Sequence, residues 1–290
     1  MAVGPYGALL ETVRGVRWPA RRQVAGGAPG EHLARTRGVA TEFAEYRPYR
    51  QGDDPRRIDW KLLARSDRAF IRLAPDRSVM ATLIAVDASA SMAFPPVSNG
   101  KWWCARQLAV ACAAVAHGGA DPVGLAVASV NAMVRLPPRT RRGVITEIAR
   151  TIDGIAPGGS TSLADAFIGA PPRVLVITDC LGALDGLRRA ARAHVATGAE
   201  VHVAHIVSHA ELDPARGATL ATDPEDPYMA RALTDNNRLA YRAAFDGWRG
   251  EVARDWRDDG VAYHEVLDNE AIDRAVRRVV APAGNRVARQ

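Results

Sequence analysis

The sequence is poor in cysteine and contains no long apolar run. It has 3 cysteines, Cys104, Cys112 and Cys180, in 290 residues. Cys104 and Cys112 lie on one expected helix, about 12 Å apart along its axis, which is too far for a disulfide. No apolar stretch is long enough to span a bilayer, and residues 1–10 lack the basic-then-apolar order of a secretory signal. We therefore expect a cytoplasmic protein in a reducing compartment.

The motifs of several enzyme classes are also missing. There is no Gly-x-x-x-x-Gly-Lys-Ser/Thr loop, so we do not expect the chain to hydrolyse a nucleotide itself. No Ser-His-Asp or Cys-His set occurs in a suitable order. Aromatic residues make up 6% of the chain and are sparse near its basic N-terminal residues, which disfavours base stacking on a nucleic acid.

The net charge of +6 is confined to one part of the chain. Residues 1–80 hold 15 Lys and Arg against 9 Asp and Glu, whereas residues 81–290 hold 23 of each. Six arginines near the N-terminus could bind phosphates: Arg14, Arg17, Arg21, Arg22, Arg35 and Arg37. Leucines and valines beside them could form an interfacial helix. We favour an ordinary docking helix with a solvated basic face, and a basic adaptor for a membrane or nucleic-acid surface is the alternative.

Apolar strands alternate with helices over most of the chain. Strands are expected over residues 80–86, 123–129, 132–136, 174–178, 200–207 and 261–267, and helices over 101–117, 141–153, 184–197, 233–258 and 271–280. This alternation predicts an α/β fold, a doubly wound and mostly parallel sheet covered on both faces. On the helix 233–258, the side chains expected to face inward are Leu239, Phe245, Trp248, Val252 and Trp256.

The first 78 residues differ from the rest in pattern. Strands are expected near 42–49 and 69–73. The stretch between them is rich in turn-forming residues and in charges of both signs, and it also holds Trp60, a residue that favours burial. We divide the chain into a basic β-containing extension (1–78), an α/β domain (79–282) and a frayed tail (283–290).

Polar oxygens follow two of the expected strands. Asp87, Ser89 and Ser91 form an Asp-x-Ser-x-Ser sequence at the end of the first, and Asp179 ends the strand 174–178. Thr161 follows a glycine-rich loop, with Ser160 as its substitute if the register differs by one. Because ligands in open α/β sheets bind at the carboxyl ends of strands, these oxygens predict a site for Mg²⁺, with Mn²⁺ or Ca²⁺ as alternatives. The structural alternative is that Asp87 and Ser89 only cap a turn.

The set resembles the metal-ion-dependent adhesion site of von Willebrand factor A domains. That resemblance implies hydroxyl ligands from Ser89, Ser91 and Thr161, with Asp87 and Asp179 as charged anchors, directly or through water. It also implies an open coordination position that accepts a carboxylate from a protein partner.

The extension carries a longer signature, Gly-Asp-Asp-x-Arg-x-Ile-Asp-Trp-Lys over residues 52–61. Together with the Asp-x-Ser-x-Ser strand it resembles the family called domain of unknown function 58, over about residues 30–282. The matching positions, an expected interaction motif, are Arg47, Gly52, Asp53, Asp54, Arg56, Asp59, Trp60 and Lys61. Two features depart from the family: Cys180 stands where glycine is usual, and the transmembrane helices of longer members are missing.

The acids of this motif have two interpretations. Asp53, Asp54 and Asp59 could form a catalytic cluster, but no nucleophile or activated base is apparent nearby. We favour a salt-bridge network with neighbouring arginines, which is also compatible with an interaction surface.

The family resemblance implies a partner, a MoxR-type AAA+ ATPase or its client. The expected function is a non-enzymatic, divalent-metal-dependent protein-binding module that acts in chaperone-like maturation of protein complexes. The alternative is a Mg²⁺-dependent phosphoryl-transfer enzyme, because strand-end acids also serve that chemistry.

Overall fold

The structure is a computed structural model that falls into two compact units. It describes residues 4–20, 29–33, 45–50, 55, 58–66, 68–73, 77–159, 161–182, 184–214, 219–222, 230–234 and 237–282. The larger unit holds the described residues up to Trp18 and those from Ala81 onward, and the smaller unit holds those between Pro19 and Met80. This division differs from the boundary that we expected at residue 78, because the first helix clusters with the α/β domain. The tail 283–290 lies outside the described residues.

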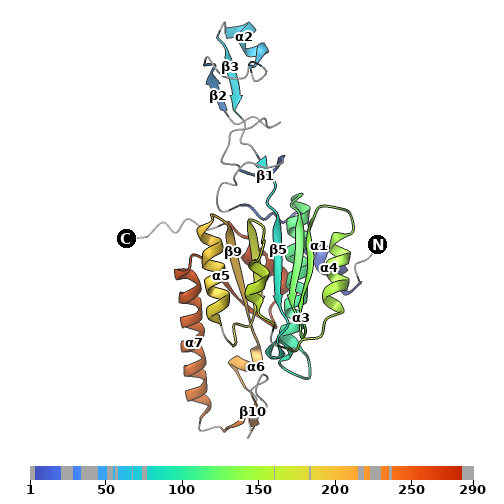
Figure 1. Cartoon of the computed structure of the whole chain (residues 1–290), viewed down its shortest axis with the longest axis vertical. Helices are drawn as coiled ribbons and strands as arrows, with labels where there is room; N and C mark the ends of the chain where they lie inside the picture. The colour runs from blue at the N-terminus through green and yellow to red at the C-terminus, as the bar shows by residue number, and fades with distance from the viewer. Residues whose placement is uncertain are drawn as a thin grey trace. The chain divides into compact units, whose positions relative to one another are not determined.

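A six-stranded sheet forms the centre of the larger unit (Figure 1). Its order is β12-β9-β8-β5-β6-β7, and every neighbouring pair is parallel except β6 and β7. The strands are β5 (Thr82–Asp87), β6 (Val123–Ala128), β7 (Met133–Arg139), β8 (Arg173–Thr178), β9 (Glu200–Val207) and β12 (Ala262–Leu267). The predicted doubly wound, mostly parallel α/β fold is confirmed.

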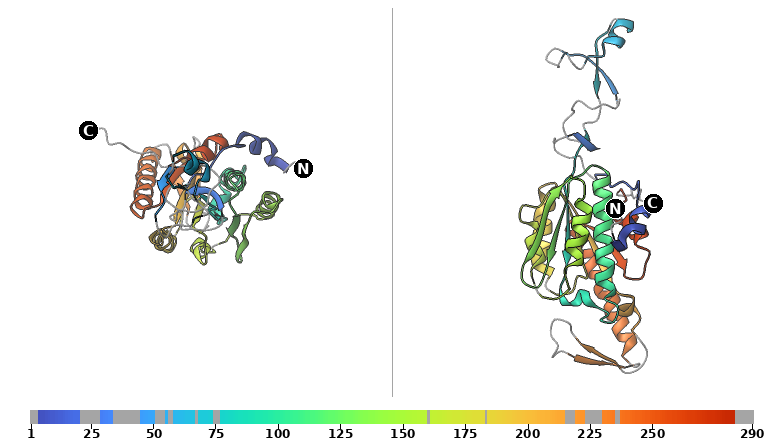
Figure 2. Two further views of the ribbon diagram at one scale, coloured as in Figure 1. Left: turned by 90° about the horizontal axis from the view of Figure 1, so that it is seen from above. Right: turned by 90° about the vertical axis from the view of Figure 1, so that its right-hand side faces the viewer.

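Helices cover both faces of this sheet, as the two views of Figure 2 show. On β5, Ile84 and Val86 face one hydrophobic cluster, and Leu83 and Ala85 face the other. The first cluster is covered by α3 (Gly100–Gly118), α4 (Val144–Asp153) and α8 (Ile272–Val280). The second is covered by η4 (Leu163–Phe167), α5 (Leu184–Ala196) and α7 (Arg238–Asp258). Alternating residues of one buried strand therefore fill two separate cores.

The prediction for the long helix α7 was partly wrong. Leu233 lies in strand β11 (Ala230–Leu233), which pairs with β10 (Thr219–Thr222), and the helix begins at Arg238. Leu239 is 76% exposed. Val252 and Trp256 do face the core, so only the C-terminal half of α7 is packed on the sheet.

The N-terminal segment is docked on the larger unit, as favoured from the sequence. Tyr6, Val13 and Trp18 are buried in the first core. The short helix η1 (Gly4–Tyr6) carries Tyr6, and Val13 directly follows α1 (Gly7–Thr12); both elements contact α3. The Tyr6 hydroxyl donates a 2.5 Å hydrogen bond to Asp153 at the end of α4. Of the six basic residues considered for phosphate binding, Arg14 and Arg17 lie among the described residues.

Among its described residues, the smaller unit contains two short antiparallel ladders and one helix. The ladders are β1 (Pro29–Leu33) with β4 (Arg77–Ser78) and β2 (Glu45–Pro48) with β3 (Phe70–Leu73), and the helix is α2 (Trp60–Ser66). The second ladder confirms the strand pair expected from the sequence.

Asp59 fixes the start of α2, because its Oδ1 accepts hydrogen bonds from the amides of Lys61 and Leu62, each 3.0 Å long. The expected burial of Trp60 was wrong: this residue is 62% exposed. It is the first residue of the helix that Asp59 caps, and Ile58 instead forms a bridge with Ile71. Arg47 and Lys61 are also described, and the other motif residues, Gly52, Asp53, Asp54 and Arg56, lie outside the described residues.

The larger unit also contains buried thiol and histidine side chains. Cys104, Cys112 and Cys180 are free and buried. His202 and His205 lie on opposite faces of β9, because His202 contacts Trp18 and His205 contacts Trp248.

Among the described residues, no helix has the length and apolarity needed to cross a membrane.

Candidate metal centre at the carboxyl edge of the sheet

Two acids stand at the ends of adjacent parallel strands. Asp87 is the last residue of β5, and Asp179 follows Thr178 at the end of β8. Burial raises the pKa of Asp87, and the charge of Asp179 raises it further. The structure therefore brings these two predicted anchors to one place, where their negative charges interact.

The Asp-x-Ser-x-Ser turn has a defined arrangement. Asp87 Oδ1 accepts a 2.9 Å hydrogen bond from the Ser89 amide, and its Oδ2 accepts a 2.7 Å bond from the Thr178 hydroxyl. The Ser89 and Ser91 hydroxyl oxygens lie 3.0 Å apart. Both serine oxygens are thus gathered beside an oriented carboxylate, with Ser91 at the start of the short helix η3 (Ala90–Ala93).

The glycine-rich loop is held against this turn by its backbone. The Gly158 amide donates a 2.7 Å hydrogen bond to the carbonyl of Ala88. Gly159 has φ +95°, and a Cβ there would lie 2.4 Å from the Val130 Cα, so only glycine fits. The Thr161 hydroxyl donates its proton to the Ser129 carbonyl, which leaves its oxygen lone pairs available.

A lysine that sequence reasoning missed completes the edge. Lys101, in the first turn of α3, is fully buried. Its Nζ lies 2.9 Å from Asp179 Oδ2 and 2.6 Å from Glu211 Oε1. Burial alone would lower the pKa of Lys101, but these two carboxylates reverse the effect and raise it. Lys101 is therefore a buried ammonium ion shared between two acids.

Glu211 is positioned by the short helix α6 (His209–Leu212) that follows β9. It forms a capping box with Ser208, whose amide donates a 2.8 Å bond to Glu211 Oε2. Ser208 in turn donates a 2.6 Å hydrogen bond to Asp268 after β12. The Ser-x-x-Glu spacing after an apolar strand is a signal that could have identified this helix start. Burial raises the pKa of Glu211, with Lys101 opposing and Asp179 adding to the rise.

The donor set of this edge consists of carboxylate and hydroxyl oxygens, the ligand type that a hard divalent cation prefers. Asp179 and Glu211 share the ammonium group of Lys101, and Asp87 is a third acid whose pKa the charge of Asp179 helps to raise. Among the described residues, no group of three or more His, Cys, Asp or Glu side chains is arranged to hold a metal ion. An ion would thus depend on the hydroxyls of Ser89, Ser91 and Thr161, with Asp87 and Asp179 supplying charge. Ser160 lies outside the described residues.

Cys180, which departs from the usual glycine, has φ +57°. That is the left-handed region where glycine is favoured over a residue with a Cβ. Its amide donates a 3.1 Å hydrogen bond to Thr178 Oγ1, the hydroxyl that also contacts Asp87. Burial raises the pKa of its thiol. Cys180 therefore shapes the loop through its backbone, and its thiol is not activated.

The fold and this edge define the class of protein: an α/β domain whose strand-end loops resemble a metal-ion-dependent adhesion site. The chain belongs to the family described as "Protein of unknown function DUF58", whose model matches residues 45–250. Uncharacterized proteins of Mycobacterium bovis and Mycobacterium tuberculosis are each 32% identical to it over 194 residues. The match covers 62% of this chain and 60% of each relative, so the chain spans about 60% of the length of these curated relatives.

Solved structures of low similarity were also found. A conserved hypothetical protein, BatB from Bacteroides thetaiotaomicron, has 18% identity and a TM-score of 0.46, covering 69% of this chain and 97% of its own. A von Willebrand factor type A protein from Catenulispora acidiphila has 17% identity and a TM-score of 0.33, covering 47% and 35%. The fold assignment rests on the strand order itself and not on these matches.

Proposed function

We propose that this protein is a non-enzymatic protein-binding module that uses a divalent cation at the carboxyl edge of its sheet. The observation that carries the proposal is the pair of strand-end acids, Asp87 and Asp179, with the hydroxyl oxygens of Ser89 and Ser91 beside Asp87. A bound cation would supply positive charge and a coordination position for a carboxylate of the partner. The chain's own residues hold the ion and orient the loops around it.

The partner in this proposal is a MoxR-type AAA+ ATPase or its client, in chaperone-like maturation of protein complexes in the cytoplasm. The support is the family membership together with the Asp-x-Ser-x-Ser turn. An acid on the partner suits the site, because serine and threonine hydroxyls leave the charge of a divalent ion partly uncompensated.

The first test measures the ion alone. Titration of the full chain with Mg²⁺ or Mn²⁺ by calorimetry should show one site, which Asp87→Ala abolishes. Asp258→Asn removes an exposed acid of α7 and serves as the matched control with unchanged affinity. Equal binding by the Asp87→Ala variant would contradict a metal role for this edge.

The second test adds the partner. The purified MoxR-type ATPase of the same organism should bind the full chain in Mg²⁺, and binding should fall in a chelator or with Asp87→Ala. Undiminished binding in both conditions would count against metal bridging, even if the ion itself binds.

The enzymatic alternative has its own assay. Metal-dependent hydrolysis of p-nitrophenyl phosphate that disappears in Asp87→Asn would favour a phosphoryl-transfer enzyme. We expect no such activity, because serines occupy the positions where that chemistry needs a second carboxylate or a nucleophile. Salt-sensitive binding lost on deletion of residues 1–40 would instead favour the basic-adaptor alternative.

A further inference from the structure

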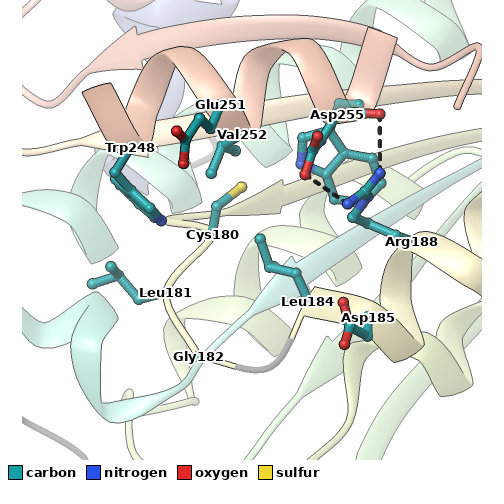
Figure 3. Close-up of a pocket in the computed structure, with 11 residues that line it drawn as sticks. Cys180, Leu181, Gly182, Leu184, Asp185, Arg188, Trp248, Glu251, Val252 and Asp255 are labelled. Atoms are coloured by element: carbon teal, nitrogen blue, oxygen red, sulfur yellow. Dashed lines mark hydrogen bonds and ion pairs between the residues drawn. The ribbon is translucent and has the colours of Figure 1, made fainter. Parts of the chain in front are cut away.

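A cavity of about 350 Å³ lies beside the metal edge, between α5, α7 and the loop after β8 (Figure 3). Trp248 and Glu251 of α7 face it from one side, and Leu184 and Asp185 of α5 face it from the other. It belongs to the larger unit. Its lining includes Cys180, Leu181 and Gly182, the loop residues that directly follow Asp179.

The cavity carries uncompensated negative charge. Its one lining arginine, Arg188, is already engaged: its Nε lies 2.8 Å from Asp259, and its NH1 lies 2.6 Å from Asp255. The nearest cation to Glu251 is Arg254, 4.0 Å away, with both side chains 69% exposed, so that pair is weak. Asp185 also interacts with Arg188, whose pKa its charge helps to raise, so Glu251 is the acid available to a cationic guest.

One wall of the cavity is a fixed aromatic surface. The Trp248 ring stacks on Phe245 at 5.4 Å and meets His205 edge-on at 5.5 Å. These contacts hold the indole in place, while Leu184 adds aliphatic surface opposite it. An apolar wall with an acidic rim suits a side chain that has an aliphatic stem and a cationic head.

We propose that this cavity binds an arginine side chain of a partner protein. The guanidinium group would reach the carboxylate of Glu251, and its plane would lie against Trp248. Arginine fits better than lysine, because its planar, weakly hydrated head stacks on an indole and makes two hydrogen bonds to a carboxylate. This assignment does not depend on a metal ion.

The cavity and the metal edge share one loop. Asp179 faces the metal edge, and its Oδ1 accepts a 3.2 Å hydrogen bond from the amide of Leu181, which lines the cavity. If the proposed function is right, a partner would present an acid to the ion and an arginine to the cavity. The simultaneous binding of an acid and an arginine rests on the proposed function, whereas the binding of an arginine in the cavity does not.

The experiment is an NMR titration of the full-length, ¹⁵N-labelled chain with the peptide N-acetyl-Gly-Arg-Gly-amide. Amide shifts are expected at Gly182, Asp185 and Glu251. The isosteric citrulline peptide, which lacks the charge, should bind about fivefold more weakly or not at all. Glu251→Gln should weaken the arginine peptide about fivefold, and Asp258→Asn, an exposed acid of the same helix outside the cavity, should leave it unchanged.

Three outcomes would overturn the assignment. The first is that the citrulline peptide binds as tightly as the arginine peptide. The second is that Glu251→Gln and Asp258→Asn change the affinity for the arginine peptide equally. The third is that free agmatine binds more tightly than the arginine peptide, which would indicate a small-molecule site. Binding should be the same in Mg²⁺ and in a chelator, and with Asp87→Ala. The metal titration tests the proposed function and the peptide titration tests the cavity site, so each experiment can fail without affecting the interpretation of the other.

Discussion

The central sheet holds a buried base between two acids at each of its edges, and the two clusters differ in what surrounds them. At the amino edge, Arg173 opens β8 and lies 3.3 Å from Glu200 and 3.6 Å from Asp121. At the carboxyl edge, Lys101 lies between Asp179 and Glu211. Each base is fully buried, so the two clusters place similar charges at a similar depth.

The surroundings separate a structural cluster from a binding one. The Arg173 guanidinium lies 4.7 Å from the centre of the Trp18 ring, which covers it with an apolar surface. The carboxyl-edge cluster has instead a further acid, Asp87, and hydroxyl oxygens beside it. Arginine is a fixed charge that matches two carboxylates, whereas lysine is a point charge. We infer that the amino edge closes the fold, and that the carboxyl edge is arranged to accept another cation.

The largest expected effect is at the amino edge. Arg173→Met leaves Asp121 and Glu200 buried without their central cation, and removal of one member of a buried ion network costs about 4 kcal/mol. Urea denaturation should show this loss equally in Mg²⁺ and in a chelator. A loss below about 1 kcal/mol would show that this cluster does not contribute to the stability of the fold.

Lys101→Met tests the opposite edge. In a chelator we expect a loss of about 3 kcal/mol, because Asp179 and Glu211 lose their cation. In Mg²⁺ the loss should shrink, because an ion replaces the missing charge, and the affinity for Mg²⁺ should rise about tenfold. The measurements are urea denaturation and calorimetry. If Mg²⁺ rescued both variants, or neither, the proposed difference between the two edges would be wrong.

Acid titration gives a further test of the carboxyl edge through His205. Burial lowers the pKa of His205 to about 4, although Asp179 acts in the opposite direction. The unfolded chain therefore takes up a proton below pH 6.5 that the folded chain excludes, so stability falls as the pH drops from 6.5 toward 4.

Between neutral pH and pH 5 the His205 contribution to this loss should be about 2 kcal/mol. His205→Gln should remove this contribution from the pH dependence of the free energy of unfolding. His117 is near the end of α3 and lies away from this edge, so His117→Gln should leave the contribution in place. An unchanged slope in His205→Gln would contradict burial as its cause. The measurement is denaturation at a series of pH values.

The sequence predicted the sheet and the positions of the two acids, because both depend on local order. An apolar run followed by Asp87 or Asp179 identifies a buried strand and its carboxyl end without any knowledge of the partners. The two strands β2 and β3 and the opposite orientation of His202 and His205 follow from strand periodicity in the same way.

Lys101 and Glu211 could not be predicted in this way. They are separated by 110 residues, and nothing local indicates that a lysine at the start of a helix turns into the core. Glu211 lies between the expected strand 200–207 and the expected helix 233–258, in a segment to which no element was assigned. Trp60 shows the reverse error: its type favours burial, but its place at a capped helix start leaves it exposed. Tertiary contacts decided all three positions, and residue type did not.

The smallest effect comes from an ion pair outside both edge clusters, and it sets the scale for the other changes. The Arg141 side chain, 53% exposed, lies 2.7 Å from Glu147 in the first turn of α4. Solvent screening and the entropy of holding two long side chains offset most of this attraction, so Glu147→Gln should change the free energy of unfolding by less than about 0.5 kcal/mol. Mg²⁺ should not alter that value. A larger loss in urea denaturation would mean that charge removal is costly wherever it occurs, and the contrast between Arg173 and Lys101 would then no longer separate a structural edge from a cation-binding one.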